Sequence, residues 1–355
     1  MRLIDQFKEK LFQRYLVWLC RPARLRRHLK SVLPQPYIPV PVDRKRVRAA
    51  ALQVELKLFK NPLAYADEMH RRVKEAFEAG AQIVAFPEYN SLPLFGMLPG
   101  IDELEKSYQN APDQSAGKNT GSGISLADIF SFMTPAVKPF IDLLFSSLAQ
   151  AYGVYIMAGS YPFAEAGTVV NRSFLYSPEG RLIGSQDKVH LLPVEAEWQL
   201  KRGRSFSHFD TPLGRLAIPV CMDATYYETF RILESHRVDI VLLPIANLEE
   251  YNYWLALRGI WPRVQESVIY GIKSSLVGSV AGFTFTGRAG IFAPLEITPK
   301  RDGVLSEVET FNSEAMAVAD LDLDALHQLR LNHPWRDHNP TLTNGTKGTG
   351  PFVPL

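Results

Sequence analysis

Three segments of the sequence have the pattern of a strand that leads into a side chain able to take part in acyl transfer. Glu88 follows "IVAFP", Lys188 lies in "GSQDKVHLLP", and Cys221 lies in "LAIPVCMD". A sheet holds the ends of its strands rigidly, so side chains placed there can project into a cleft. A thiol supplies a nucleophile, a carboxylate moves protons, and an ammonium group stabilises an oxyanion. Together, the three residues predict an acyl-transfer site.

Each of these residues, taken alone, also fits an ordinary structural role. A lone cysteine at a strand end is usually a small buried apolar residue. A glutamate after a proline is usually solvated or caps a turn, and the Asp187-Lys188 pair fits a charged hairpin. The functional interpretation therefore depends on the three segments occurring together and in this order.

The elements around these residues predict an α/β fold. Residues 47–56 and 81–90 have the pattern of strands, and residues 65–80 between them have the pattern of a helix, which gives a β-α-β opening. An apolar helix is expected up to about Tyr152, after a loop over 107–125 that is rich in Ser, Gly, Asn and Gln. Further strands and helices then follow as far as residue 322.

Composition excludes several classes of protein. Of 355 residues, 46% are hydrophobic and 21% are charged, which is typical of a globular chain and not of a disordered chain or a coiled coil. The two cysteines, Cys20 and Cys221, are too few for a disulfide framework and too far apart for a metal knuckle, so a reducing, cytoplasmic location is expected. The longest uncharged stretch, Leu143 to Ala164, contains polar residues that favour a buried helix followed by a buried strand over a membrane span. No secretory signal and no nucleic-acid motif is recognised.

The first 48 residues differ in charge from the remainder of the chain. They contain thirteen Lys and Arg and three Asp and Glu, whereas the whole chain has a net charge of only +2. Residues 1–32 predict an amphipathic helix, interrupted near Pro22, with one apolar stripe formed by Ile4, Phe7, Leu11, Tyr15 and Trp18. Basic flanks and an aromatic apolar stripe are typical of a helix that lies on an anionic membrane surface. The alternative is a helix packed on the body or on another subunit.

These observations divide the chain into four predicted parts. Residues 1–33 form the basic amphipathic arm, and residues 34–46 form a stiff Pro-rich spacer. The catalytic domain covers 47–340, and a tail covers 341–355.

The segments "AFPEYN", "DKVHLLPVEAEWQLKRG" and "VCMDATYYE" resemble, in this order and spacing, the nitrilase (carbon–nitrogen hydrolase) superfamily in its amidase-like branch. The resemblance covers roughly residues 48–340. It implies a four-layer αββα sandwich, and it assigns Glu88, Lys188 and Cys221 as a catalytic set that needs no metal and no organic cofactor. It also implies a second glutamate shortly after the lysine. By its placement we assign this role to Glu197, with Glu195 as the alternative.

The same motifs predict the chemistry and three substrate-binding residues. Cys221 would attack an amide carbonyl and form a thioester, Glu88 would transfer protons, and Lys188 with the backbone N–H of Met222 would hold the oxyanion. Tyr89, Met222 and Asn247 are the expected substrate-binding residues. A homodimer or larger homo-oligomer is expected from the family.

The residues after Cys221 favour a neutral amide substrate. Met222-Asp223 is the amidase-like form, since true nitrilases carry Trp-Glu there. Branches that act on carboxylate-bearing substrates often place an Arg just after the Asp, where this chain has Ala224. Arg172 or Arg288 could supply that charge from elsewhere. Apolar residues between 94 and 133 could line a pocket for an apolar amide, although they more readily cover the sheet. A nitrilase, an acyl transferase and a catalytically idle scaffold are the alternative functions.

Overall fold

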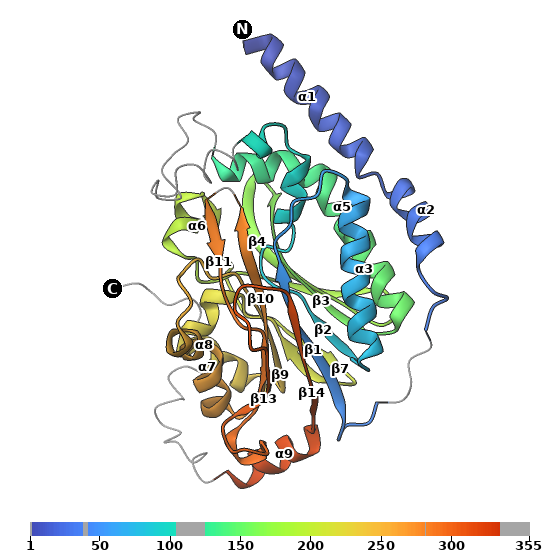
Figure 1. Cartoon of the computed structure of the whole chain (residues 1–355). Helices are drawn as coiled ribbons and strands as arrows, with labels where there is room; N and C mark the ends of the chain where they lie inside the picture. The colour runs from blue at the N-terminus through green and yellow to red at the C-terminus, as the bar shows by residue number, and fades with distance from the viewer. Residues whose placement is uncertain (1, 38–41, 104–124, 281, 334–355) are drawn as a thin grey trace.

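The computed structural model describes residues 2–37, 42–103, 125–280 and 282–333 (Figure 1). The predicted tail over 341–355 and nearly all of the predicted loop over 107–125 lie outside these residues. The helices are α1 (Arg2–Leu19), α2 (Pro22–Val32), α3 (Pro62–Glu78), α5 (Leu126–Tyr152), α6 (Pro193–Glu197), α7 (Tyr227–Ser235), α8 (Tyr253–Ser267) and α9 (Leu323–Asn332), with 3₁₀ helices η1 (Leu92–Met97), η2 (Cys221–Thr225) and η3 (Leu295–Ile297).

The strands agree with the predicted α/β pattern. They are β1 (Val47–Glu55), β2 (Ile83–Ala85), β3 (Tyr155–Glu165), β4 (Thr168–Tyr176), β5 (Leu182–Asp187), β6 (Leu200–Lys201), β7 (His208–Thr211), β8 (Gly214–Ala217), β9 (Ile240–Ile245), β10 (Tyr270–Val280), β11 (Phe283–Phe285), β12 (Gly290–Phe292), β13 (Val304–Glu307) and β14 (Ala315–Leu321). The uncharged stretch from Leu143 to Ala164 forms the end of α5 followed by β3, as predicted.

The strand order brings four strand ends to one edge of the sheet. The main path runs β5-β4-β3-β2-β1-β10-β9-β8-β7. Strands β3, β2, β1, β10, β9 and β8 pair in parallel from neighbour to neighbour, and β5 shares their direction because β4 is antiparallel to both β3 and β5. The carboxyl ends of β2, β5, β8 and β9 therefore meet at the same edge. These ends lead into Glu88, Lys188, Cys221 and Asn247.

Period-two alternation along the strands builds four layers. In β1, Ala49 and Ala51 face one hydrophobic cluster while Ala50 and Leu52 face another. The sheet folds over so that two halves face each other, and the first cluster lies between them. The second lies under α3 and α5, and a third cluster, which includes Val241 of β9, lies under α7 and α8. The order helix, sheet, sheet, helix confirms the predicted αββα sandwich.

The N-terminal arm packs on the outer face of α5. Helices α1 and α2 are separate, with the break at Arg21-Pro22 as predicted. Leu16 of α1 and Leu25 and Leu29 of α2 are buried in the cluster that also contains the apolar face of α5. Helix α5 is long and apolar enough to cross a membrane by length and composition alone, but its apolar face packs on β3 and β4 as a core helix does.

Candidate active site

Cys221 is the first residue of the 3₁₀ helix η2, shortly after the β8 strand, and its backbone is strained. Its φ is +47°, in the left-handed region that residues other than glycine rarely adopt. Such a conformation costs about 1–3 kcal/mol and persists only where neighbouring groups hold it. Here Asp223 holds it, because its carboxylate accepts hydrogen bonds from the backbone N–H of Val220 at 2.9 Å and of His190 at 2.7 Å.

Asp223 also joins this turn to the segment that carries the lysine. Its Oδ1 accepts from the backbone N–H of Val189 at 3.2 Å and lies 2.9 Å from His190 Nδ1, which must carry its proton toward a carboxylate that can only accept. Asp223 is fully buried. It therefore fixes the position of the nucleophile relative to Lys188, which directly precedes Val189.

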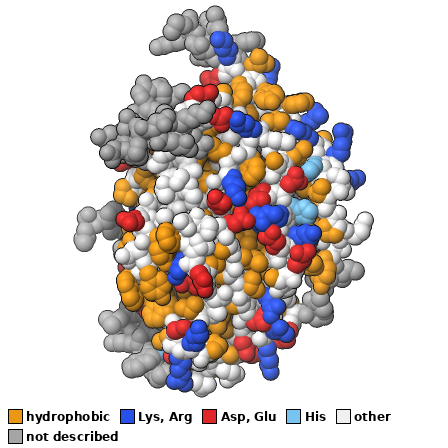
Figure 2. Space-filling model, in the orientation of Figure 1, with side chains coloured by type: hydrophobic (Ala, Val, Ile, Leu, Met, Phe, Trp, Pro, Cys, Tyr) orange, Lys and Arg blue, Asp and Glu red, His pale blue; other side chains and the backbone are white. Residues whose placement is uncertain are grey.

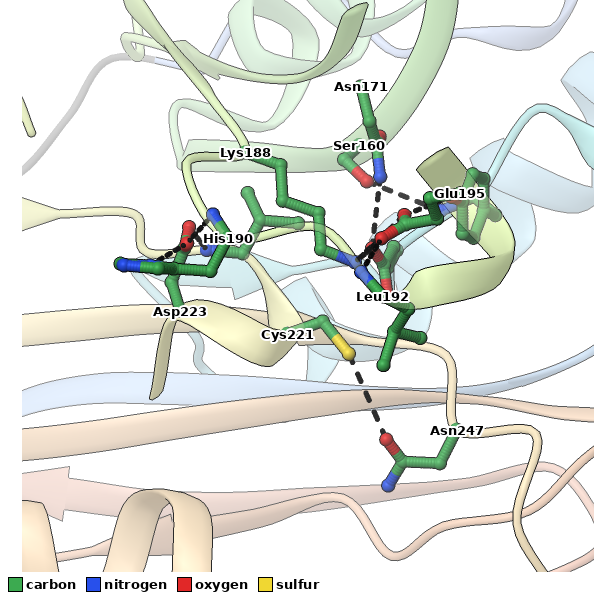
Figure 3. Close-up of polar contacts among 12 residues, drawn as sticks. Ser160, Asn171, Lys188, His190, Leu192, Glu195, Cys221, Asp223 and Asn247 are labelled. Carbon is green, nitrogen blue, oxygen red and sulfur yellow. Dashed lines mark hydrogen bonds and ion pairs between the residues drawn. The ribbon is translucent and has the colours of Figure 1, made fainter. Parts of the chain in front are cut away.

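Glu88 and Lys188 form a fully buried ion pair at the strand ends. Lys188 Nζ lies 2.8 Å from Glu88 Oε1, and both side chains are 0% exposed. Asn171, from β4, donates a second hydrogen bond to the same oxygen at 2.9 Å (Figure 3). Glu88 Oε2 is buried and has no close hydrogen-bond partner within the described part of the chain, and the Cys221 thiol lies near enough to lower the pKa of Glu88. One oxygen of Glu88 is thus held in place, and the other is free to receive a proton.

The second glutamate of the cluster is Glu195 and not Glu197. Lys188 Nζ lies 2.8 Å from Glu195 Oε1 and 2.7 Å from Glu195 Oε2, and Glu195 is 1% exposed. Glu197, at the end of the short helix α6, is exposed. Residues two apart on a helix point to nearly opposite sides, so only one of the two can face the lysine. The prediction of Glu197 is wrong in its placement, and the alternative residue occupies the site.

Burial and neighbouring charge set the protonation of the cluster. Burial raises the pKa of Glu88 to about 7, although the positive charge of Lys188 opposes the shift, and the Glu195 carboxylate adds to it. Burial, and then the charge of Glu88, raises the pKa of the Cys221 thiol well above its usual value, while Lys188 lowers it. Burial alone would lower the pKa of Lys188, but the two carboxylates hold it above its ordinary value. The resting site is therefore a neutral thiol beside an ammonium ion and a carboxylate that can take up a proton near neutrality.

The three predicted substrate-binding residues surround this cluster in different ways. The Asn247 Oδ1 atom lies 3.8 Å from Cys221 Sγ, and Figure 3 shows the sulfur pointing toward it. Met222 follows the nucleophile and is half-buried. Tyr89 is buried, and its hydroxyl donates to Glu195 Oε1, so its phenol supports the second glutamate. Of the three, Asn247 is the polar side chain adjacent to the thiol.

Tyr89, Trp198 and Phe283 form a series of aromatic rings in contact. The Trp198 ring lies 6.1 Å from the Tyr89 ring and 5.7 Å from the Phe283 ring, and both Trp198 and Phe283 are half-buried. The apolar residues between 94 and 133 were predicted either to line a pocket or to cover the sheet. Leu94 is buried in the hydrophobic core, whereas Phe95, Phe130 and Met133 line a cavity between α5 and the strands β3 and β4.

Two residues that organise the site were not identified from the sequence. Asn171 is a buried amide within β4, next to Arg172 and Ser173, so its polarity alone does not single it out in the sequence. Asp223 belongs to the predicted nucleophile segment, but its role in holding two loops depends on contacts between distant segments. Among the described residues, no group of three or more His, Cys, Asp or Glu side chains is arranged to hold a metal ion.

This fold and this site match one known family. The model of the carbon–nitrogen hydrolase family matches residues 48–330. The chain belongs to this family, which confirms both the resemblance of its motifs and the prediction of an enzyme that hydrolyses carbon–nitrogen bonds other than peptide bonds.

Several curated proteins are similar over most of the chain. The probable hydrolase YhcX of Bacillus subtilis (strain 168) is 26% identical over 316 residues, which is 88% of this chain but only 54% of the relative. This chain thus spans about half the length of that protein. The omega-amidase NIT2 of Homo sapiens is 23% identical over 299 residues, covering 81% of this chain and 92% of the relative. A nitrilase of Pyrococcus abyssi (strain GE5 / Orsay) is 24% identical, covering 81% and 94%.

Solved structures of an amidase share the fold. The amidase from Nesterenkonia sp. is 19% identical and covers 87% of this chain and 99% of its own, with a TM-score of 0.59. A mutant of the amidase from Nesterenkonia sp. AN1, with the same TM-score and coverage, shows covalent addition of the acetamide moiety of fluoroacetamide at the active-site cysteine. At these identities the likeness shows the architecture.

Proposed function

We propose that this protein is a thiol-dependent amidohydrolase that cleaves the C–N bond of a small neutral amide through a thioester on Cys221. One observation supports this proposal above all others. Glu88 is fully buried, its Oε1 is fixed by Lys188 and Asn171, and its Oε2 lacks a close hydrogen-bond partner in the described part of the chain. A purely structural glutamate would be expected to have both oxygens satisfied.

The proposed reaction uses each group of the cluster. The Cys221 thiol is neutral at rest, so attack on the amide carbonyl requires that Glu88 take its proton as the S–C bond forms. Lys188 Nζ and the backbone N–H of Met222 would hold the oxyanion. Glu88 then returns the proton to the leaving nitrogen as the C–N bond breaks, which releases ammonia or an amine and leaves the thioester.

Hydrolysis of the thioester reverses these steps with water. Glu88 takes a proton from the water as it attacks, and Cys221 leaves as the thiol. Glu195 acts through Lys188. Its carboxylate contacts Nζ at 2.7 Å and accepts from the backbone N–H of Leu192 at 2.7 Å, so it positions the ammonium group and keeps it charged. The reaction as proposed releases a carboxylic acid.

The charges around the site favour a neutral amide. Ala224 follows Asp223, and the two arginines that could have supplied a charge are already paired. Arg172 lies 2.8 Å from Glu165 and also pairs with Asp187, while Arg288 lies 3.6 Å from Glu307. The aromatic series formed by Trp198 and Phe283 supports an apolar acyl group. The omega-amidase relatives support an amide substrate.

A substrate panel tests this proposal. The purified full chain is incubated with straight-chain primary amides of increasing length, with a dicarboxylic acid monoamide, and with the matching nitriles, and released ammonia is measured. Turnover of the neutral amides, absent in a Cys221→Ser control, supports the proposal. Preferred turnover of nitriles would identify a nitrilase. Preferred turnover of the monoamide would show a carboxylate-bearing substrate. Turnover that persists in the Cys221→Ser control would remove the proposed nucleophile.

We include two further expectations in this proposal. The chain is expected to act in the cytoplasm and to assemble into a homodimer or larger homo-oligomer, as its family resemblance implies. An acyl transfer in which an amine replaces water is an alternative end for the same thioester. Addition of an amine to the panel and detection of a substituted amide would reveal it.

A further inference from the structure

Helix α1 has two apolar faces, and only one of them packs on the body. Leu16 is 0% exposed, and the Phe12 ring stacks on the Phe132 ring of α5 with centroids 5.9 Å apart. Gln13 Nε2 donates to the backbone carbonyl of Phe132 at 3.0 Å. This face fixes the arm against α5 and confirms that the arm packs on the body.

The second apolar face points to solvent. Leu11, Tyr15 and Trp18 recur at spacings of four and three, and they are 58%, 50% and 52% exposed. The Tyr15 and Trp18 rings stack with centroids 6.0 Å apart, so they form one surface. We call these three residues the exposed stripe. They belong to the stripe predicted from the sequence, whose other members, Ile4 and Phe7, have side chains outside the described set.

One basic side chain lies against the exposed stripe and others are exposed on the following helix α2; we call Arg21, Arg26 and Arg27 together the basic border. The Arg21 guanidinium lies 5.2 Å from the centre of the Trp18 ring. On α2, Leu25 is buried against the body, whereas Arg26 and Arg27 are exposed. The described ion pairs of the chain include none of these three arginines. Figure 2 shows hydrophobic side chains along the arm with Lys and Arg side chains beside them.

We propose that the exposed stripe and its basic border are a docking surface for an anionic lipid bilayer. Trp and Tyr rings prefer the boundary between headgroups and acyl chains, and each basic residue near an anionic surface adds to the attraction. The arm carries a net charge of +7 over residues 1–32, from nine Lys and Arg and two Asp and Glu. A second copy of the chain is disfavoured as the occupant, because a symmetric contact through the stripe would bring two basic borders together.

Point variants of the full chain test this surface. Deletion of the arm is unsuitable because it would remove Leu16, Leu25 and Leu29 from the core. Trp18→Ser removes part of the stripe, and Arg26→Glu with Arg27→Glu reverses part of its border. Trp254→Ser, at a tryptophan that is 76% exposed on α8, and Lys300→Glu with Arg301→Glu, at exposed positions, are the matched controls.

The readout is sedimentation with vesicles of phosphatidylglycerol and phosphatidylcholine, compared with pure phosphatidylcholine. The full chain should sediment with the anionic vesicles at low salt and less so at physiological salt. The stripe variant and the border variant should each weaken binding by at least about tenfold, while both controls stay within about twofold.

Three results would overturn this proposal. The first is a full chain that ignores anionic vesicles at low salt. The second is binding that Trp18→Ser and the border variant leave unchanged, since another surface would then be responsible. The third is a change in oligomer size, measured by analytical ultracentrifugation, caused by Trp18→Ser alone. That result would identify the stripe as a contact between copies.

Discussion

Two regions of this molecule handle charge in opposite ways. In the catalytic cluster, Lys188 is fully buried and contacts two carboxylates at 2.7–2.8 Å. In the arm, Arg26 and Arg27 are exposed and take part in none of the described ion pairs. The difference shows what each region is suited for. Charges held by fixed partners away from water can act on a bound substrate, whereas unpaired charges at the surface can act on a partner that brings the opposite charge.

The energetics of the two regions follow from their solvent exposure. Removal of one partner from a buried pair typically costs about 3–5 kcal/mol, because the remaining charge stays buried without compensation. Exposed pairs contribute about 0–1 kcal/mol and are screened by salt. Substitutions in the cluster should therefore be severe and independent of salt, and those in the arm mild and dependent on it.

The largest effect is expected for the nucleophile. Cys221→Ala should abolish amide turnover, because loss of a nucleophile costs on the order of a millionfold in rate. The fold should remain, because the substitution removes only a sulfur atom, whose contacts are with Asn247 Oδ1 and the backbone of Ala246. Activity is measured as ammonia release, and the fold is checked by circular dichroism. Residual activity within tenfold of the unmodified chain would remove Cys221 from the mechanism.

The next largest effect is expected for the buried ion pair of Glu88 and Lys188. Glu88→Gln and Lys188→Ala should each lower kcat/KM by at least about a hundredfold, as expected for a lost general base or oxyanion donor. Lys188→Ala should also lower the free energy of unfolding by about 3–5 kcal/mol, because it leaves two buried carboxylates without a positively charged partner. Denaturant titration measures this loss. A Lys188→Ala protein as stable and active as the original would show that the pair is neither buried nor catalytic in solution.

The two glutamates of α6 provide a matched pair. Glu195→Gln should lower kcat by at least about tenfold, because Lys188 loses a charge partner and its pKa falls. Glu197→Gln should leave kcat within about twofold, since substitution of an exposed residue usually changes the rest of the structure little. A shift of the basic limb of the pH–rate profile toward lower pH in Glu195→Gln would distinguish positioning of the lysine from general destabilisation. The reverse ranking would restore Glu197 as the second glutamate.

The pH dependence should report the burial of Glu88. Glu88 must be deprotonated to accept the thiol proton, and burial raises its pKa to about 7. Activity should therefore fall as pH decreases through about 7, and kcat/KM against pH measures that limb. An acid limb near the ordinary glutamate value, about 4.3, would show that Glu88 is solvated or is not the base.

The smallest effect is expected from salt. Raising ionic strength from low to physiological values should change kcat/KM for a neutral amide by less than about twofold, because buried charges are poorly screened. The same change should weaken vesicle binding by the arm. A strong salt dependence of amide turnover would contradict the contrast between the two regions.

Much of the site was predictable, because strands can be recognised in the sequence and the carboxyl ends of parallel strands lie at the same edge of a sheet. Glu88 and Cys221 follow apolar runs and Lys188 follows the strand β5, and the strand directions bring these ends together. The choice between Glu195 and Glu197 was not predictable in this way. Both lie in a helix of five residues, and spacing alone does not show which side of so short a helix faces the lysine.

The orientation of the arm was likewise not predictable from the sequence. The stripe of Leu11, Tyr15 and Trp18 was predicted, but the face that packs on α5, with Phe12 and Leu16, was not. A helix with apolar residues on two sides has no single periodic face, so the sequence does not show which side meets the core. Contacts between distant segments, such as Asn171 with Glu88, depend on the tertiary fold and are not shown by a local sequence pattern.

The most direct test of the central claim is the intact mass of the protein during turnover. The full chain, the Glu88→Gln variant and the Cys221→Ala variant are incubated with the best amide of the panel and with fluoroacetamide, quenched in acid, and digested to locate the adduct. We predict one added acyl or acetamide group on the peptide that contains Cys221, and none on the Cys221→Ala protein. An adduct on another residue, or rapid turnover by the Cys221→Ala protein, would contradict the assignment of Cys221 as the nucleophile.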